Sequence, residues 1–127
     1  MFETIFSDQS DKNPQNEDGL TPFHLSCAYG QMKIVDVFVK NSKILKINLN
    51  SITNTCGWTG FHCACQNGQL KIAEFLMENS DNFDIDVRAK PFYGTVFHLA
   101  CKSRHLGVAN FLIENSVALN IDFNSRF

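Results

Sequence analysis

Three similar segments recur along this chain, and their spacing constrains its fold more than any other feature. The segments begin at Thr21, Thr59 and Thr95, and they read TPFHLSCAYG, TGFHCACQNG and TVFHLACKSR. The starting threonines lie 38 and 36 residues apart. Periods of about 20–50 residues are typical of repeat proteins, whose units bury their apolar faces only by stacking on their neighbours. The sequence therefore predicts one solenoid of stacked units.

Each segment opens with a pattern typical of a short helix. Thr is a favourable N-cap, and Pro22 suits the first helical position because its missing amide hydrogen would have no helical partner. Phe and His follow two and three residues after each Thr, and a small residue follows at the fifth position. Gly30 and Gly68 stand nine residues after Thr, where a left-handed residue commonly ends a helix, and Arg104 occupies that position in the third unit.

A second apolar pattern follows this turn in every unit. It consists of apolar pairs four residues apart and predicts an amphipathic helix of about three turns. The pairs are Ile34-Val35 and Phe38-Val39, then Ile72-Ala73 and Leu76-Met77, then Val108-Ala109 and Leu112-Ile113. Beyond them, hydrophobic and polar residues alternate, which predicts a short extended arm. The hydrophobic arm residues are Ile47 and Leu49, Ile85 and Val87, and Ile121 and Phe123.

These residues resemble the ankyrin repeat, whose signature includes Thr-Pro-Leu-His-x-Ala in a unit of about 33 residues. The resemblance implies an all-α ankyrin-repeat solenoid of stacked helix-turn-helix units joined by extended finger loops. It implies a single array over residues 1–127, with a partial repeat at 1–15 and repeats at about 16–53, 54–90 and 91–127, the last incomplete. The added residues of each unit fall in loops, where insertions cost little free energy.

Both ends of the chain resemble parts of repeats. Ile5 and Phe6 precede Thr21 by the spacing of a second-helix apolar pair, so we interpret residues 1–10 as the tail of a repeat. The apolar pattern continues through Phe111, Leu112 and Ile113, whereas terminal units of solenoids usually carry a polar outer face. The chain is therefore either a fragment of a longer array or a short form that dimerises through its open end.

The resemblance also implies a concave surface, formed by the fingers and first helices, that binds a partner protein. The contact positions are the residues before Gly-x-Thr, the x itself, and the pair after the small residues of the first helix. They correspond to Glu17, Asp18, Leu20, Ala28 and Tyr29, to Thr55, Cys56, Trp58, Gln66 and Asn67, and to Phe92, Tyr93, Lys102 and Ser103. The aromatic residues among them are the expected anchors, because aromatic side chains dominate binding hot spots. The alternative is that Trp58, Phe92 and Tyr93 only pack against neighbouring fingers.

A metal-binding or thiol redox-sensing module that uses His62, Cys63, Cys65 and Cys56 is the alternative function. The repeat register argues against it. Packed helices lie about 8–10 Å apart, so histidines of different units cannot share a zinc ion with bonds of about 2 Å. We expect each imidazole to bond the backbone of the adjacent finger instead. Cys65 shares its repeat offset with Cys27 and Cys101, which predicts that these thiols are buried apolar side chains.

Composition excludes several other classes of protein. The net charge of −2, without long runs of one sign, does not favour nucleic-acid binding. No stretch approaches the roughly 18 apolar residues of a membrane span, and no phosphate-binding or nucleophile motif is present. Five cysteines without any Asn-x-Ser/Thr sequon indicate reduced thiols in the cytoplasm or nucleus. The sequence predicts an intracellular, non-catalytic scaffold that uses no cofactor or metal and binds a protein of unknown identity.

Overall fold

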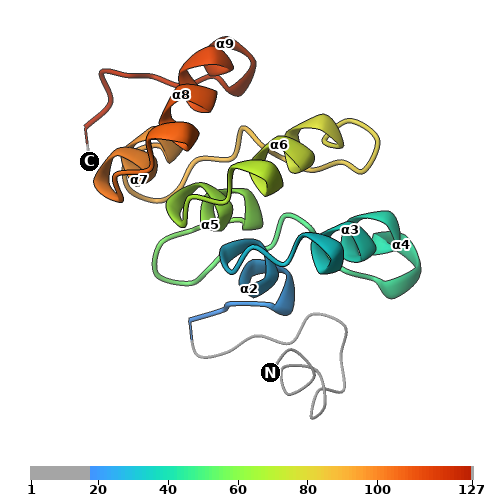
Figure 1. Ribbon diagram of the computed structural model, residues 1–127. Helices are drawn as coiled ribbons and strands as arrows, with labels where there is room; N and C mark the ends of the chain where they lie inside the picture. The colour runs from blue at the N-terminus through green and yellow to red at the C-terminus, as the bar shows by residue number, and fades with distance from the viewer. Residues whose placement is uncertain (1–17, 127) are drawn as a thin grey trace.

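The computed structural model describes residues 18–126, in which three helix pairs stack into two layers (Figure 1). The first layer holds α2 (Pro22–Ala28), α5 (Gly60–Gln66) and α7 (Val96–Lys102). The second layer holds α3 (Met32–Lys40), α6 (Leu70–Glu78) and α8 (Leu106–Glu114). Helices of one layer contact their neighbours in the same layer, and each first-layer helix contacts the second-layer helix that follows it. The predicted all-α solenoid of stacked helix-turn-helix units is confirmed.

Two parts of the sequence-based interpretation lie outside the described residues. They are the partial repeat at 1–15, with Ile5 and Phe6, and the candidate contact residue Glu17. The repeat boundaries proposed from the sequence stay a prediction. Within residues 18–126, no helix is long and apolar enough to cross a membrane.

The first helices begin and end as the sequence predicts. Thr21, Thr59 and Thr95 are extended N-cap residues whose hydroxyl oxygens accept the backbone N–H three residues later. Gly30 and Gly68 take a φ of +73°, and Arg104 takes +62° at the same offset. A side chain in this left-handed region is strained, so the third unit forms the same turn at a higher conformational cost.

The core lies between the two layers and between successive units. Phe23 packs edge-on against Phe38 across the layers, with ring centroids 6.4 Å apart. Gly60 lies so close to the first unit that a Cβ atom there would stand 2.6 Å from the ring of Phe23 and 3.1 Å from Sγ of Cys27. The absence of a side chain at this position lets α5 approach α2 closely.

The second helices and the residues that follow them differ from the sequence prediction. The second helices have nine residues, or about two and a half turns, rather than three. The added residues form one-turn helices, α4 (Ser42–Leu45) and α9 (Ser116–Leu119), in the first and third units. The arms contain turns rather than strands within the described residues. Each arm follows a left-handed residue 25 positions after Thr, namely Lys46, Asp84 or Asn120.

Polar side chains of the arms join successive units. The side-chain amide of Asn50 donates to the carbonyl of Asp84 (2.8 Å), and its oxygen accepts the backbone N–H of Asp86 (2.8 Å). Arg88, at the same offset in the second unit, donates from Nε to the carbonyl of Ala118 (2.7 Å). These bonds hold the arms of the first and second units against the next unit of the stack.

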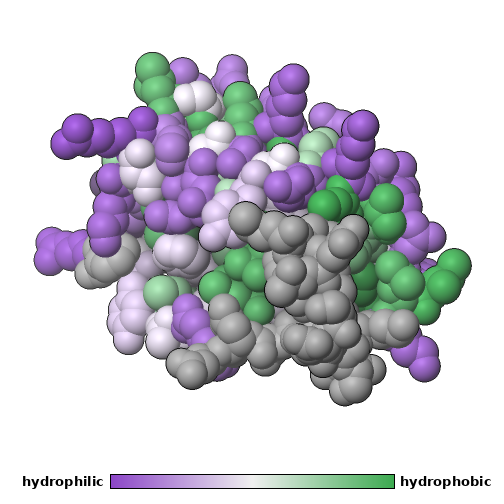
Figure 2. Space-filling model, turned by 60° about the horizontal axis from the view of Figure 1, so that its bottom comes forward, coloured by the Kyte–Doolittle hydropathy of each residue, from purple (hydrophilic) through white to green (hydrophobic). Residues whose placement is uncertain are grey.

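The prediction that Cys101 is buried like Cys27 and Cys65 is wrong. Cys27 and Cys65 are fully buried, because α5 and α7 pack over them, whereas Cys101 is exposed. Within residues 18–126 no further helix pair covers α7 and α8. In Figure 2, hydrophilic residues cover most of the upper and left parts of the described surface, and a group of hydrophobic residues lies at the right.

Candidate protein-interaction surface

The histidines of the first two units each connect a first helix to the loop beside it. The backbone N–H of Thr21 donates to Nδ1 of His24 (3.0 Å), which forms a reciprocal capping box. Because a backbone N–H can only donate, Nδ1 is unprotonated and Nε2 carries the hydrogen. Nε2 then donates to the carbonyl of Trp58 (2.9 Å) in the next finger. The predicted histidine-to-finger bond is confirmed here.

His62 makes the same connection to a different part of its neighbouring finger. Its Nδ1 accepts the N–H of Thr59 (3.0 Å), and its Nε2 lies 2.8 Å from the carbonyl of Ala89. Ala89 precedes Thr95 by six residues, whereas Trp58 immediately precedes Thr59. The third finger, which is one residue shorter between Gly and Thr, therefore presents a different carbonyl to the imidazole.

Burial keeps these imidazoles neutral. Desolvation lowers the pKa of His24, and it lowers the pKa of His62 from 6.5 to about 4, against smaller opposing effects of the backbone carbonyls. A protonated ring would also place an N–H at Nδ1, opposite the N–H of the capping threonine. Both ring nitrogens of His62 thus form hydrogen bonds with backbone groups, and the ring connects two units.

Backbone hydrogen bonds hold the three fingers side by side. The N–H of Asn54 donates to the carbonyl of Asp18 (2.8 Å), and the N–H of Phe92 donates to the carbonyl of Cys56 (2.8 Å). The hydroxyl of Thr55 donates to Oδ1 of Asp18 (2.6 Å). The candidate residues of the described fingers therefore form one continuous row across the units.

Trp58 has a structural role in the second finger. Its carbonyl accepts the N–H of Thr53 (3.0 Å) as well as the imidazole of His24, and its own N–H donates to Oγ1 of Thr53 (3.1 Å). Its ring is half-buried against the core, as is the side chain of Leu20 in the first finger. Much of Trp58 thus packs within the fold, as the alternative interpretation of this residue expects.

Phe92, Tyr93 and Tyr29 are the exposed aromatic residues of this surface. Their exposed fractions are 54%, 62% and 69%, respectively. The ring of Phe92 also lies against Gly57, where a Cβ atom would stand 2.4 Å from it. Gly57 has a φ of +67°. One face of Phe92 therefore packs on the second finger while the rest of the ring stays accessible.

The first helices contribute polar groups to the candidate surface. The side-chain amide of Gln66 donates to Oγ of Ser103 (3.3 Å), which links the second and third units. The amide of Asn67 donates to the carbonyl of Cys63 (2.8 Å) within its own helix. Asn67 and Lys102 are exposed. Ala28 contributes its carbonyl, which accepts from Nε2 of Gln69 (3.1 Å) in the next unit.

Two residues of the finger row were not among the sequence candidates. Ile52 is exposed at the base of the second finger, and Asn54 packs its amide against Gly19, 3.0 Å from where a Cβ atom would stand. Ile52 interrupts a polar run from Asn50 to Thr55, which is the signal that could have indicated an exposed apolar contact.

The thiols do not form the reactive cluster that the alternative function requires. Burial raises the pKa of Cys63 to about 12, with Cys56 and Asp18 as smaller contributions, and burial also raises the pKa of Cys65 and Cys27. Reactive cysteines are instead partly exposed and have a lowered pKa. Among residues 18–126, no group of three or more His, Cys, Asp or Glu side chains is placed to hold a metal ion.

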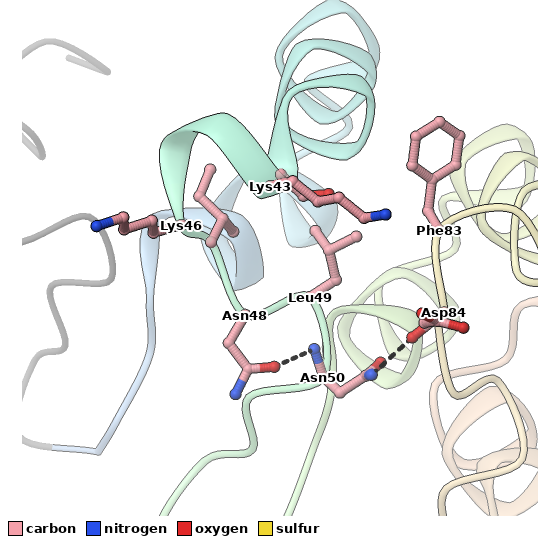
Figure 3. Close-up of a pocket in the computed structure, with 9 residues that line it drawn as sticks. Lys43, Lys46, Asn48, Leu49, Asn50, Phe83 and Asp84 are labelled. Atoms are coloured by element: carbon pink, nitrogen blue, oxygen red, sulfur yellow. Dashed lines mark hydrogen bonds between the residues drawn. The ribbon is translucent and has the colours of Figure 1, made fainter.

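A hollow of about 340 Å³ lies away from the fingers, between α4 and the turn at Phe83-Asp84 (Figure 3). Lys43 points across it toward Phe83, Lys46 points away, and Asn50 bridges its two walls through the bond to Asp84. Most of its lining side chains are exposed or half-buried. The hollow is a groove between adjacent units that lacks the enclosed apolar walls of ordinary ligand pockets.

Comparison with known families agrees with this architecture. The family described as ankyrin repeats in three copies matches residues 1–89 and 42–126, which together cover nearly the whole chain. Comparison with curated proteins finds no match. Ankyrin repeats are in general protein-interaction modules without catalytic activity. On this match and on its helix-turn-helix stack, the chain belongs to the ankyrin-repeat family.

Proposed function

We propose that this chain is a non-catalytic scaffold that binds a partner protein through its fingers and first helices. The observation that carries the proposal is the position of Tyr29, Phe92 and Tyr93. These large aromatic side chains are exposed along a surface whose backbone is held by hydrogen bonds within and between units. Aromatic residues on rigid elements lose little conformational entropy on binding and supply much of the contact area of interfaces.

The polar residues of this surface suit a neutral, amide-rich interface. Gln66, Asn67 and Thr55 are polar residues of the same fingers and first helices, while Asp18 and Lys102 contribute opposite charges at different units. The surface therefore favours a protein partner over nucleic acid, which requires a cluster of basic side chains. We place the protein inside the cell, because its cysteines are free thiols, which are typical of proteins in reducing compartments.

The experiment is an affinity capture in which the chain and two variants serve as bait. The test variant combines Tyr29→Ala with Tyr93→Ala, and the control variant is Ile44→Ala, which removes an exposed apolar side chain from α4. All three baits are first compared by circular dichroism and thermal unfolding. Partners found by mass spectrometry are then produced and titrated against each bait.

We expect the double tyrosine variant to bind a captured partner at least about tenfold more weakly, because hot-spot aromatic residues each contribute about 2 kcal/mol or more. The Ile44→Ala variant should bind as the unchanged chain does. If the folded tyrosine variant keeps every partner at full affinity, the proposed surface is wrong. A loss of binding in Ile44→Ala alone would place the interface on the opposite layer.

A further inference from the structure

Two grooves lie at equivalent places along the stack, one at each joint between units. The first groove is the hollow of about 340 Å³ between α4 and the turn at Phe83-Asp84. The second groove has a volume of about 490 Å³ and lies between the second arm and Ala118 of α9. Lining residues that share an offset from the threonine of their unit are Ser42, Lys43, Ile47, Asn48, Leu49 and Asn50 in the first and Ser80, Asp81, Ile85, Asp86, Val87 and Arg88 in the second. The groove is therefore a feature of the repeat that is formed twice.

The two grooves adjoin one another. Asn50 lines the first groove, and its side-chain amide bonds the backbone of Asp84 and of Asp86, at 2.8 Å in each case. Asp86 in turn lines the second groove. Because successive units stack in the same orientation, both grooves open on the side of the molecule where α4 and α9 lie (Figure 1). Packed helices are about 8–10 Å apart, so the grooves are about 10 Å apart.

Both grooves have an apolar floor. Leu49 in the first groove and Ile85 in the second are 5% and 6% exposed, and Ile47 and Val87 are half-buried beside them. The other lining side chains of the second groove are exposed or half-buried, as they are in the first. Each groove can therefore cover an apolar side chain of a partner, but it does not enclose a small molecule as ordinary ligand pockets do.

The charges of the two grooves are opposite. Lys43 points across the first groove toward Phe83, whereas the residue at the offset of Lys43 in the second groove is Asp81 (Figure 3). In the same way, the neutral Asn48 of the first groove corresponds to Asp86 in the second. Lys43, Asp81 and Asp86 are exposed. The apolar floor is thus repeated, while the charge beside it is reversed.

Three further charged residues line the grooves. Lys46 lines the first groove, but its side chain points away from it (Figure 3). Asp84 belongs to the wall that separates the grooves and adds to the negative charge of the second unit. Arg88 donates from Nε to the carbonyl of Ala118 (2.7 Å), which holds its guanidinium at the far wall of the second groove. From the first groove to the second, the charge therefore changes from positive to negative before Arg88 is reached.

We propose that the two grooves together bind one extended segment of a partner protein, with an acidic side chain at Lys43 and a basic side chain at Asp81 and Asp86. Apolar side chains of the segment cover the two floors and supply the contact area, and the opposite charges fix its register. An extended chain spans about 3.3–3.6 Å per residue, so grooves about 10 Å apart take side chains about three residues apart. This site lies away from the fingers and does not depend on the function proposed for them.

Selection from a random peptide library, with the unchanged chain as target, supplies the probe. Peptides that the Tyr29→Ala and Tyr93→Ala variant no longer binds report on the fingers and are set aside. Among the others, we expect peptides with an acidic and a basic residue about three positions apart and apolar residues beside them. Lys43→Glu and Asp81→Lys should each weaken binding of such a peptide by about two- to tenfold in a calorimetric titration, because each replaces an attraction with a repulsion.

A charge exchange provides the sharpest test. The double variant of Lys43→Glu and Asp81→Lys should bind a second probe, in which the acidic and basic residues of the peptide are exchanged, as tightly as the unchanged chain binds the first probe. Lys33→Glu and Glu114→Lys make the same charge changes at exposed positions outside both grooves, and they should leave binding unchanged.

Three results would overturn the proposal. The first is a selection in which every enriched peptide requires the finger tyrosines. The second is an equal effect of the groove variants and their controls, or an exchanged probe that does not bind the double variant. The third is self-association of the chain that the groove variants abolish, because a second copy would then occupy the grooves. None of these results bears on the finger surface, which the tyrosine variant tests separately.

Discussion

Acid should weaken this fold through His62, and the size of the effect follows from its environment. The folded protein holds His62 neutral, because burial lowers its pKa from 6.5 to about 4. The unfolded chain binds a proton at this residue as the pH falls through 6.5, but the folded chain does so only near pH 4. The stabilisation is therefore present above pH 6.5 and is lost progressively between pH 6.5 and about 4.

The magnitude is about 3 kcal/mol, because each unit of pKa difference corresponds to about 1.4 kcal/mol. Domains of this size are stable by about 5–15 kcal/mol, so this loss is a large fraction of the total. Burial lowers the pKa of His24 as well, and that residue adds to the effect in the same direction.

His62→Gln provides the matched variant. Glutamine at this position of a capping box can still bond the N-cap backbone, but it does not titrate. For each protein, urea unfolding at pH 7 and at pH 4 gives the loss of unfolding free energy between the two pH values. This loss should be smaller in His62→Gln by about 3 kcal/mol, because the carboxylates contribute equally to both proteins. Identical pH dependence in the two proteins would refute the buried, neutral imidazole.

Three further predictions concern packing, the joints and the thiols. Gly60→Ala should lower the unfolding free energy by about 1–3 kcal/mol in urea titrations, because its Cβ atom would meet Phe23; an unchanged midpoint would contradict the close approach of α5 to α2. Asn50→Ala should cost about 1–3 kcal/mol by removing two hydrogen bonds between units, and hydrogen exchange should then rise in the second arm rather than throughout the chain. In dilute neutral solution a thiol reagent should modify Cys101 promptly and Cys65 only upon unfolding, so equal rates would show that α7 does not cover α5.

Much of this architecture could be predicted because the repeat register is local. Thr59 caps its helix through its own hydroxyl, and Gly68 ends the helix through its own conformational freedom. Such features depend on a few neighbouring residues and recur wherever the same residues recur. The bond from His24 to the next finger could also be expected, because a buried imidazole requires a partner and the finger backbone is the group beside it.

The remaining features depend on the surroundings of each unit. Cys101 has the sequence context of Cys65, but only Cys65 has a helix packed over it, so the shared pattern could not predict their different exposure. The partner of His62 depends on the path of a shortened finger, which brings Ala89 rather than the residue before Thr95 to the ring. Sequence spacing shows that a residue is missing but not how the backbone closes around it.

The same distinction applies to the proposed binding surface. The sequence identified Trp58 and Phe92 as aromatic candidates, but it could not show whether each side chain packs against a neighbouring finger or is exposed to a partner. The structure places Trp58 half-buried in a hydrogen-bonded finger and leaves about half of Phe92 exposed beside Gly57. Burial of a finger side chain depends on the neighbouring finger, which lies more than 30 residues away in the sequence.

Hydrogen–deuterium exchange of the chain with a captured partner tests whether the fingers and first helices bind it. We predict slower exchange at residues 54–58, 66–67 and 92–93, on the fingers and the first helices. Exchange in α3, α4 and α6 should stay unchanged. Protection confined to those helices, with the fingers exchanging as in the free chain, would show that the partner binds elsewhere.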